Sequence, residues 1–290
     1  MAPTFAPASH QHRDAVRRYY DVNTAIFRLF GGDRGTQTVH RSVWAEGITS
    51  LDAALNYTNS LVLDQVRCID RASPALGDLG CGTGGTLMYL APRLTSSYSA
   101  VGVTLSPVQA KRAYRNLAAA APCATLIGDY HHLPLADASL DFAFAIESFI
   151  HSSHPERFLA EVNRVLRPGG RLFVCDDFLV EKRHLGVREA EVLAEYREGW
   201  LASSLLPTGE MADLACRAGL RLIERRDLTP YLKLRTLPER LAHLLLGWRR
   251  KLGLRATVVT SSAGSLALQQ CLATGAILYQ TLLFEKSAGF

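Results

Sequence analysis

The chain has 290 residues, of which 48% are hydrophobic and 20% are charged, and its formal net charge is +5. This composition is ordinary for a soluble globular enzyme, and the length suits one large domain or one domain with a cap. The arginines are scattered and no stripe of alternating basic and aromatic residues is present, so we expect no nucleic-acid partner.

The cysteines and the apolar segments exclude further classes. Six cysteines, at positions 68, 81, 123, 175, 216 and 271, form no C-x-x-C pair. Their spacing argues against a zinc site and a disulfide scaffold, and it favours reduced thiols. No signal-peptide pattern opens the chain, and no apolar run is long enough to span a bilayer. We therefore expect a cytoplasmic protein with no metal site and no stable membrane insertion.

The N-terminal quarter is predicted to be helical. Residues 1–12 read as a flexible lead. An aromatic-rich helical pattern follows over 14–30 until Gly31-Gly32-Asp33 breaks it, and a second helical stretch covers 50–72. We interpret residues 13–73 as a helical lid.

Strands and helices alternate in the next segment, which we assign to a core domain over residues 74–180. The predicted strands are 75–79, 98–104, 124–127, 140–146 and 171–175. Helices between successive strands imply right-handed crossovers and a doubly wound, Rossmann-like α/β sheet. Ligands of such sheets bind at the carboxyl ends of the strands.

The remaining chain departs from this alternation. Charged residues surround Trp200, and we predict a helical cap insertion over 181–220 that includes a helix from Thr208 to Ala218. A strand over 221–227, a helical stretch over 236–274 and a buried strand over 276–284 make residues 221–290 the C-terminal completion of the core sheet with helices. We interpret the doublet Asp176-Asp177, after the fifth strand, as a solvated loop.

The most informative segment runs from Leu76 to Gly84. Asp78 closes a strand, and Gly80, Gly82 and Gly84 follow at alternate positions. A turn with so little side chain lets a ligand lie against the backbone, and the amides of the next helix point at that ligand. The spacing is neither the dinucleotide fingerprint nor a P-loop. The alternative is a tight strand–helix turn that binds nothing.

This turn resembles the first motif of class I S-adenosylmethionine (SAM) methyltransferases. The segment from Val101 to Gln109 resembles the G-x-T-L-S-x-x-Q segment of sterol, tocopherol and related small-molecule C-methyltransferases, and of cyclopropane fatty acid synthases. The resemblance implies a class I methyltransferase sheet with SAM as cofactor. Thr104 stands where many class I members carry a ribose-binding acid, a departure that is normal for this subgroup.

Further segments extend the resemblance. Gly128-Asp129-Tyr130 is similar to the segment whose acid accepts from the adenine amino group, although a turn acid that bonds its own backbone is the alternative. Two segments upstream also resemble this subgroup, Tyr19-Tyr20-Asp21 and His40-x-x-x-Trp44, whose counterparts form a lid over the methionine end of SAM. The alternative is that these side chains only pack in an N-terminal helical layer.

The segment Ala145 to His151 resembles the Ile-Glu-Ser/Ala segment of sterol C-methyltransferases and of bacterial prenyl diphosphate methyltransferases. There the glutamate is placed to accept a proton from a methylated carbocation. Alkylation of a C=C bond leaves a tertiary cation, which a nearby anion stabilises and can deprotonate. Glu147 could instead orient the cofactor or cap a helix, and His151 could be a polar wall of the pocket or a structural residue.

The residues that we assign to SAM are Tyr20, Asp78, Gly80, Cys81, Gly82, Thr104, Leu105, Gln109, Asp129, Tyr130 and Glu147. Those that we assign to catalysis are Glu147, His151 and Tyr20. Cys81 is read as a small residue packed beside the cofactor and not as a nucleophile.

The resemblance implies a SAM-dependent C-methyltransferase that acts on an alkene carbon of an isoprenoid or prenylated secondary metabolite. Methylation of nitrogen or oxygen in a small-molecule natural product is the alternative. A SAM-binding subunit without catalysis stays open, and a cyclopropane synthase is disfavoured because no fatty-acyl signature is present. The long N-terminal helices suggest a homo-oligomer. The sequence leaves open which substrate is methylated, whether that substrate carries a diphosphate, and whether cyclisation follows methylation.

Overall fold

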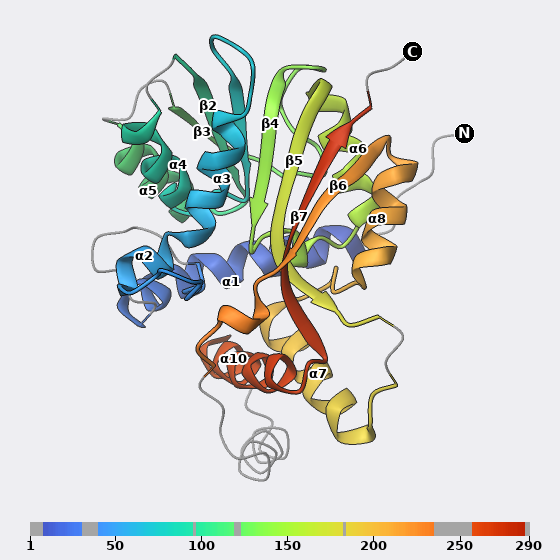
Figure 1. Cartoon of the computed structure of the whole chain (residues 1–290). Helices are drawn as coiled ribbons and strands as arrows, with labels where there is room; N and C mark the ends of the chain where they lie inside the picture. The colour runs from blue at the N-terminus through green and yellow to red at the C-terminus, as the bar shows by residue number, and fades with distance from the viewer. Residues whose placement is uncertain are drawn as a thin grey trace.

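The structure is a computed structural model that describes residues 8–30, 40–94, 97–118, 123–181, 184–234 and 257–287. Within these ranges a seven-stranded sheet has the order β3-β2-β1-β4-β5-β7-β6 (Figure 1). The strands are β1 Ala75–Leu79, β2 Ser99–Thr104, β3 Cys123–Ile127, β4 Leu140–Ile146, β5 Leu166–Leu179, β6 Leu220–Asp227 and β7 Ile277–Lys286. Strands β1 to β5 pair in parallel, whereas β7 is antiparallel to both β5 and β6. The predicted doubly wound α/β fold is confirmed.

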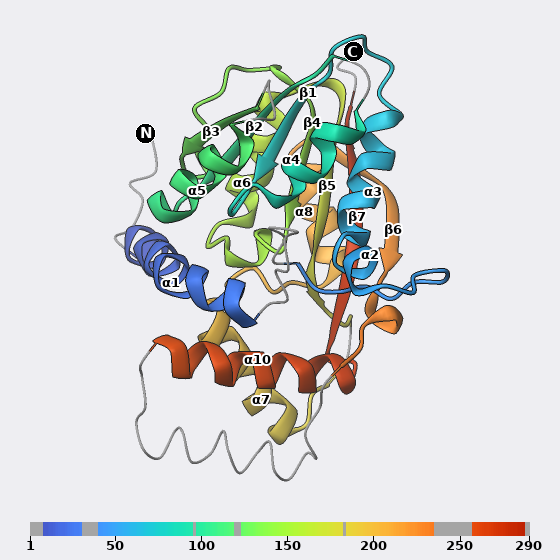
Figure 2. The ribbon, with the colours of Figure 1, turned by 90° about the vertical axis from the view of Figure 1, so that its left-hand side faces the viewer.

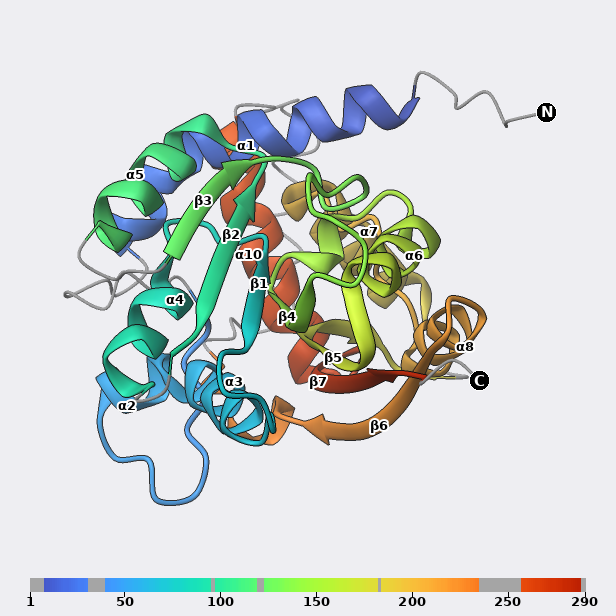
Figure 3. The same cartoon turned by 90° about the horizontal axis from the view of Figure 1, so that it is seen from above.

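Helices cover both faces of the sheet (Figure 3). The helices are α1 Ala8–Phe30, α2 Leu51–Leu55, α3 Tyr57–Arg67, α4 Gly85–Leu90, α5 Pro107–Leu117, α6 Pro155–Val165, α7 Val187–Trp200, α8 Thr208–Arg217 and α10 Thr257–Ala273, with short 3-10 turns η1 Ala91–Arg93, η2 Phe149–His151 and η3 Thr229–Tyr231. Helices α3, α4 and α5 lie on one face, and α6 and α8 lie on the other. Among the described helices none is long and apolar enough to cross a membrane.

Strand β4 shows why its sequence is a continuous apolar run. Successive side chains of a strand point to opposite faces. Phe142 and Phe144 therefore pack with the core of α3 and α4, and Ala143 and Ala145 pack with that of α6 and α8. All seven residues of β4 are buried, as expected for a central parallel strand.

Two helices form a separate layer beyond the carboxyl ends of the strands (Figure 2). Helices α7 and α10 pack on each other at close range, where a Cβ on Gly199 would lie 2.5 Å from the Cα of Gly264. Trp200 then donates from Nε1 to Ser265 Oγ at 3.2 Å. Helix α1 passes between this layer and the sheet (Figure 2).

The structure differs from the predicted segments in three places. Helix α1 begins at Ala8, so residues 8–12 of the predicted flexible lead are helical, and His12 is held by the carbonyl of His151 at 3.0 Å. Helix α8 packs on α6 and β6, so it covers the sheet and only α7 of the predicted cap lies in the outer layer. Strand β5 extends past the predicted 171–175 because β7 pairs with it from Arg171 to Leu179.

Some predictions lie outside the described residues. These are residues 1–7 of the lead, the predicted break at 31–33 and the part of the predicted 236–274 helix before Thr257.

Candidate active site

The glycine turn lies at the carboxyl end of β1, between β2 and β4. The amides of Gly80 and Cys81 donate to the carbonyl of Val103 at 2.9 and 3.0 Å, which fixes the turn on β2. Gly80 has a φ of +105°, and a Cβ there would lie 2.3 Å from the Cβ of Ser148. Gly82 has a φ of +54°, and a Cβ there would meet nothing nearer than Gln109 Nε2 at 3.9 Å. One side of the turn is therefore open for a ligand to approach the backbone.

Asp78 and Cys81 flank this turn in different ways. Asp78 is buried at the end of β1, and burial raises the pKa of its carboxyl group to about 8. The Sγ of Cys81 lies 2.8 Å from the place that a Cβ on Gly102 would take, so this side chain packs against β2 and not on the open side of the turn. Burial also raises the pKa of the Cys81 thiol, which accords with a packing role.

The loop after β2 is held by its own side chains. Thr104 Oγ1 donates to Gln109 Oε1 at 2.9 Å, and both residues are buried. Gln109 Nε2 consequently faces the open side at Gly82. Ser106 Oγ caps α5 by accepting from the amide of Gln109, and it donates to Asp21 of α1 at 2.5 Å. Leu105 is half-buried between them.

Asp129 has the bonds of a turn acid and also keeps an oxygen that could accept from the adenine amino group. Its Oδ1 accepts from the amide of His131 at 2.9 Å, as a turn acid does, and from His131 Nδ1 at 2.7 Å. Within the described residues no hydrogen bond reaches Oδ2. Burial acts to raise the pKa of Asp129, but the bonds from His131 outweigh it and lower that pKa. The hydroxyl of Tyr130 donates to the Ser148 carbonyl at 3.0 Å.

Glu147 occupies a strained position at the end of β4. Its φ of +48° is rare for a residue with a side chain, and such outliers gather at functional sites. Its Oε1 accepts from the amide of Arg41 at 2.9 Å and from the hydroxyl of Tyr279 at 2.8 Å. The side chain is half-buried, and in the described ranges Oε2 accepts no hydrogen bond.

A buried ion pair lies beside Glu147, and sequence reasoning did not find it. The guanidinium of Arg41 binds both oxygens of Asp177, at 2.5 and 2.7 Å, and Asp177 also accepts from the hydroxyl of Tyr196 at 2.5 Å. The same guanidinium lies 4.6 Å from the ring centre of Tyr279 and 5.8 Å from that of Trp200. The solvated loop predicted for Asp176-Asp177 is wrong, because β5 continues through both and buries them.

His151 and Tyr20 form a second polar pair. His151 Nε2 lies 2.6 Å from the Tyr20 hydroxyl, and the two rings meet edge to face. Burial lowers the pKa of His151 to about 4, so the imidazole is neutral at physiological pH, and burial raises the pKa of Tyr20. The pair connects α1 to the turn after β4.

Two polar side chains from the N-terminal segment are buried without a full set of partners. In the described part of the chain, neither amide atom of Asn23 on α1 has a hydrogen-bond partner, and the same holds for His40 Nδ1. Burial lowers the pKa of His40, although the charge of Glu147 opposes this. Buried polar atoms without partners are rare in native proteins, so we expect a ligand or water to supply the partners of these atoms.

The structure thus brings the predicted site residues to one edge of the sheet. The turn after β1, the loop after β2, Asp129 after β3 and Glu147 after β4 all follow carboxyl ends of neighbouring strands, and Tyr20 reaches them from α1. An open glycine turn, a buried carboxyl group at Asp78 and a carboxylate oxygen of Asp129 that is unpaired among the described residues suit the methionyl, ribose and adenine parts of SAM.

Comparisons with known proteins identify methyltransferases as relatives of this chain. A family model described as a methyltransferase domain matches residues 77–174. An O-methyltransferase from Pyrenophora dematioidea is 29% identical over 67% of this chain and 72% of its own length. The 24-methylenesterol C-methyltransferase 2 of Arabidopsis thaliana is 27% identical over 74% of this chain and 58% of its own length. This chain spans less than two thirds of several of its curated relatives.

The solved structures share the fold at low identity. Geranyl diphosphate C-methyltransferase from Streptomyces coelicolor A3(2), in complex with Mg²⁺, geranyl-S-thiolodiphosphate and S-adenosyl-L-homocysteine, superposes with a TM-score of 0.73. The match covers 97% of this chain and 100% of that chain at 17% sequence identity.

Proposed function

The chain is a class I SAM-dependent methyltransferase, and on this premise we propose that it methylates an alkene carbon of an isoprenoid or prenylated secondary metabolite. SAM supplies the methyl group from its sulfonium. The observation that carries the proposal is Glu147, a carboxylate with one oxygen held by two donors and the other without a partner among the described residues.

Each feature of Glu147 suits a carbocation. Transfer of a methyl group to one carbon of a C=C bond leaves a positive charge on the other. The two donors on Oε1 hold the carboxylate in place, so that its charge needs no reorganisation when the cation forms. Oε2 is then available to accept the proton whose loss restores a double bond. If the cation meets a second double bond first, a ring forms.

The surroundings of Glu147 are aromatic on one side. Tyr279 donates to it, and Trp200 and Tyr196 lie around the Arg41–Asp177 pair next to it. Aromatic faces favour positive charge and apolar prenyl chains alike. The sterol relatives, which their name describes as C-methyltransferases, support the same chemistry.

A second candidate is methylation of a hydroxyl group in a small-molecule natural product. His151 would be a weak base for that reaction, because burial lowers its pKa to about 4 and Tyr20 occupies its Nε2, so Glu147 is the better candidate for the hydroxyl proton. Several curated relatives are named O-methyltransferases. In that reaction Glu147 would orient the substrate or act as the base itself.

The experiment that separates the two candidates is a transfer assay with methyl-labelled SAM. The panel holds prenyl diphosphates, prenylated indoles, prenylated polyphenols, a sterol, and simple phenols and amines, each with and without Mg²⁺. The position of the new methyl group is then read by NMR. A methyl group on a former alkene carbon supports the proposal, and one on oxygen or nitrogen overturns it while leaving the cofactor and the fold in place.

A further inference from the structure

His131 takes part in a relay of hydrogen bonds that the sequence did not indicate. Its Nδ1 lies 2.7 Å from Asp129 Oδ1, and its Nε2 lies 2.7 Å from Ser152 Oγ. Asp129 follows β3 and Ser152 follows η2 after β4, so the relay connects two strand ends of the site. His131 itself is part-buried, with 15% of its side chain exposed.

The carboxylate of Asp129 decides the tautomer of His131. An ionised carboxylate can only accept, so the imidazole proton is on Nδ1 and is donated to Asp129 Oδ1. In the neutral ring Nε2 is then the acceptor for Ser152 Oγ–H, while Ser152 Oγ accepts from the amide of His154 at 3.3 Å. The partner of one ring nitrogen thus sets what the other nitrogen presents.

The order Ser–His–Asp is also that of a hydrolase triad, but the burial of the serine excludes that use. Ser152 is 0% exposed, and its carbonyl accepts from Ser204 Oγ at 2.5 Å. A nucleophile must reach a substrate carbonyl, and this hydroxyl reaches only His131 and the amide of His154 among the described residues. The relay therefore orients a group and does not attack one.

We propose that His131 is a positioning residue for the cofactor: its Nδ1–H fixes Asp129 through Oδ1, so that Oδ2 is presented to the adenine amino group. This inference rests on the assignment of Asp129 to the adenine. Two donors from His131 hold Oδ1, and a carboxylate whose rotamer is locked in advance loses less entropy when it binds a ligand.

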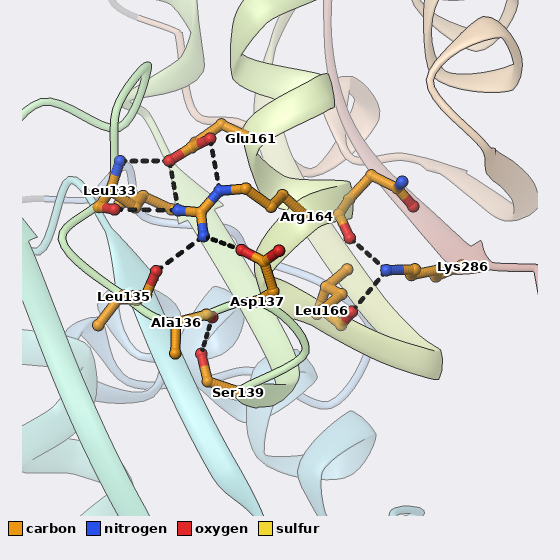
Figure 4. A network of polar contacts seen from close by, with 10 residues as sticks. Leu133, Leu135, Ala136, Asp137, Ser139, Glu161, Arg164, Leu166 and Lys286 are labelled. Carbon is orange, nitrogen blue, oxygen red and sulfur yellow. Dashed lines mark hydrogen bonds and ion pairs between the residues drawn. The ribbon is translucent and has the colours of Figure 1, made fainter.

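The loop that carries His131 is fastened separately at its other end. Arg164 donates to the carbonyls of Leu133 and Leu135 and to Asp137, and Glu161 accepts from the amide of Leu133 (Figure 4). This anchor touches neither Asp129 nor His131. Arg164→Ala therefore loosens the same loop without removing the relay, which makes it a matched structural control.

The test compares two ligands that differ at one group. The first is S-adenosylhomocysteine, and the second is its purine analogue, in which hydrogen replaces the adenine amino group. Calorimetry gives the dissociation constant of each for the wild-type chain and for the variants His131→Ala, His131→Asn, Asp129→Ala, Arg164→Ala and His132→Ala. His132 is the exposed neighbour, and its variant keeps the backbone bond to Asp129.

We expect His131→Ala to weaken S-adenosylhomocysteine binding about tenfold and to leave binding of the analogue within about twofold, since a lost charged hydrogen bond is worth roughly that factor. His131→Asn, whose amide can replace Nδ1–H, should restore most of the loss. Arg164→Ala should change the dissociation constants of the two ligands by the same factor. His132→Ala should change neither dissociation constant. The double variant His131→Ala/Asp129→Ala should lose no more amino-group selectivity than Asp129→Ala alone, because His131 acts only through Asp129.

Two results overturn the inference in distinguishable ways. If His131→Ala weakens both ligands equally, as Arg164→Ala does, or weakens neither, His131 has no positioning role. If Asp129→Ala leaves the preference for the amino group unchanged, the adenine assignment itself fails. Neither result bears on Glu147 or on where the methyl group goes.

Discussion

At the scale of single residues, Glu147 is the side chain whose charge the proposed chemistry needs. In Glu147→Gln the carbonyl oxygen can still accept from Arg41 and Tyr279, so the shape of the site is kept and the negative charge is lost. We expect SAM affinity within about twofold of the wild type and kcat lower by about 100-fold to 1,000-fold, the range for loss of a general base or a charge-stabilising group.

Calorimetry measures the SAM affinity, and steady-state kinetics with the substrate found in the panel measure kcat. Glu156→Gln is the control, because that side chain is 55% exposed on α6 and contacts His154 only at the surface. A parallel loss of SAM affinity and kcat would move Glu147 to the cofactor site.

Asp78 gives the chain a pH-dependent stability. Burial raises the pKa of its carboxyl group from 3.8 to about 8, so between these values the folded chain binds one proton more than the unfolded chain. The free energy of unfolding therefore contains a contribution that is complete below pH 3.8 and is lost as the pH rises through 8, with a slope of up to about 1.4 kcal/mol per pH unit.

Urea denaturation of the free protein at pH 5, 6, 7 and 8 measures this slope. Asp78→Asn cannot ionise, so its stability relative to the wild type should increase steadily over that range. A constant difference between the two proteins would show that Asp78 is ionised throughout. The comparison between variants removes the contributions of all other titrating groups.

At the scale of elements, α1 is fastened to the site by polar side chains. His12 binds the carbonyl of His151, Tyr20 binds the ring of the same histidine, and Asp21 accepts from Ser106. Both partner residues lie just past the carboxyl ends of strands, His151 in η2 after β4 and Ser106 before α5. The position of α1 is thus tied to the geometry of these loops, to which we assign the cofactor.

Tyr20→Phe tests this connection. The change removes the 2.6 Å bond and leaves the buried His151 Nε2 without its partner, which costs about 1–3 kcal/mol. Hydrogen exchange should become faster over residues 12–24 of α1 and stay the same in β4. Tyr114→Phe on α5 is the control, because that ring is exposed. Unchanged exchange in α1 would mean that the helix is held by other contacts.

The sequence predicts the strands of the parallel half well, since β1 to β4 each begin and end within a residue of the predicted bounds. Local patterns suffice there, because each strand is short, apolar and bounded by turn residues. The direction of β7 could not be read in this way. Its pairing with β5 and β6 joins residues that are 53 to 114 positions apart, and no local pattern encodes such a register.

In the site, too, local patterns indicate some residues and miss those whose role depends on distant segments. Strand ends and glycine motifs indicate Asp78, Asp129 and Glu147, because those residues follow recognisable segments. Arg41 and Tyr279 were missed, since their roles depend on where two distant segments dock. An isolated acidic doublet gives no sign of its arginine, which lies 136 positions earlier in the chain.

At the scale of the whole molecule, the Arg41–Asp177 pair joins four parts of the chain. It links the segment before α2 to β5, and Tyr196 and Tyr279 bring in α7 and β7. Asp177 is 0% exposed and Arg41 14%. Asp177→Ala leaves a buried arginine unpaired, so we expect unfolding to require about 3–5 kcal/mol less free energy.

Urea denaturation followed by fluorescence measures this loss. The control is Arg226→Ala, which breaks an exposed pair with Glu224 and should change stability by less than about 1 kcal/mol. If the two variants are equally stable, Asp177 does not hold these segments together. The Asp177 variant should also lose SAM-dependent turnover, because Arg41 would no longer be held beside Glu147.

The antiparallel strand between β5 and β6 has a consequence for how the chain folds as it is made. Of the seven strands, β7 is the last to leave the ribosome, yet it fills the gap between two strands that were synthesised earlier. Until then β5 exposes an unpaired edge, which invites wrong pairing. Tyr279 belongs to the same strand. The step that completes the sheet therefore also supplies the second hydrogen-bond donor to Glu147 Oε1.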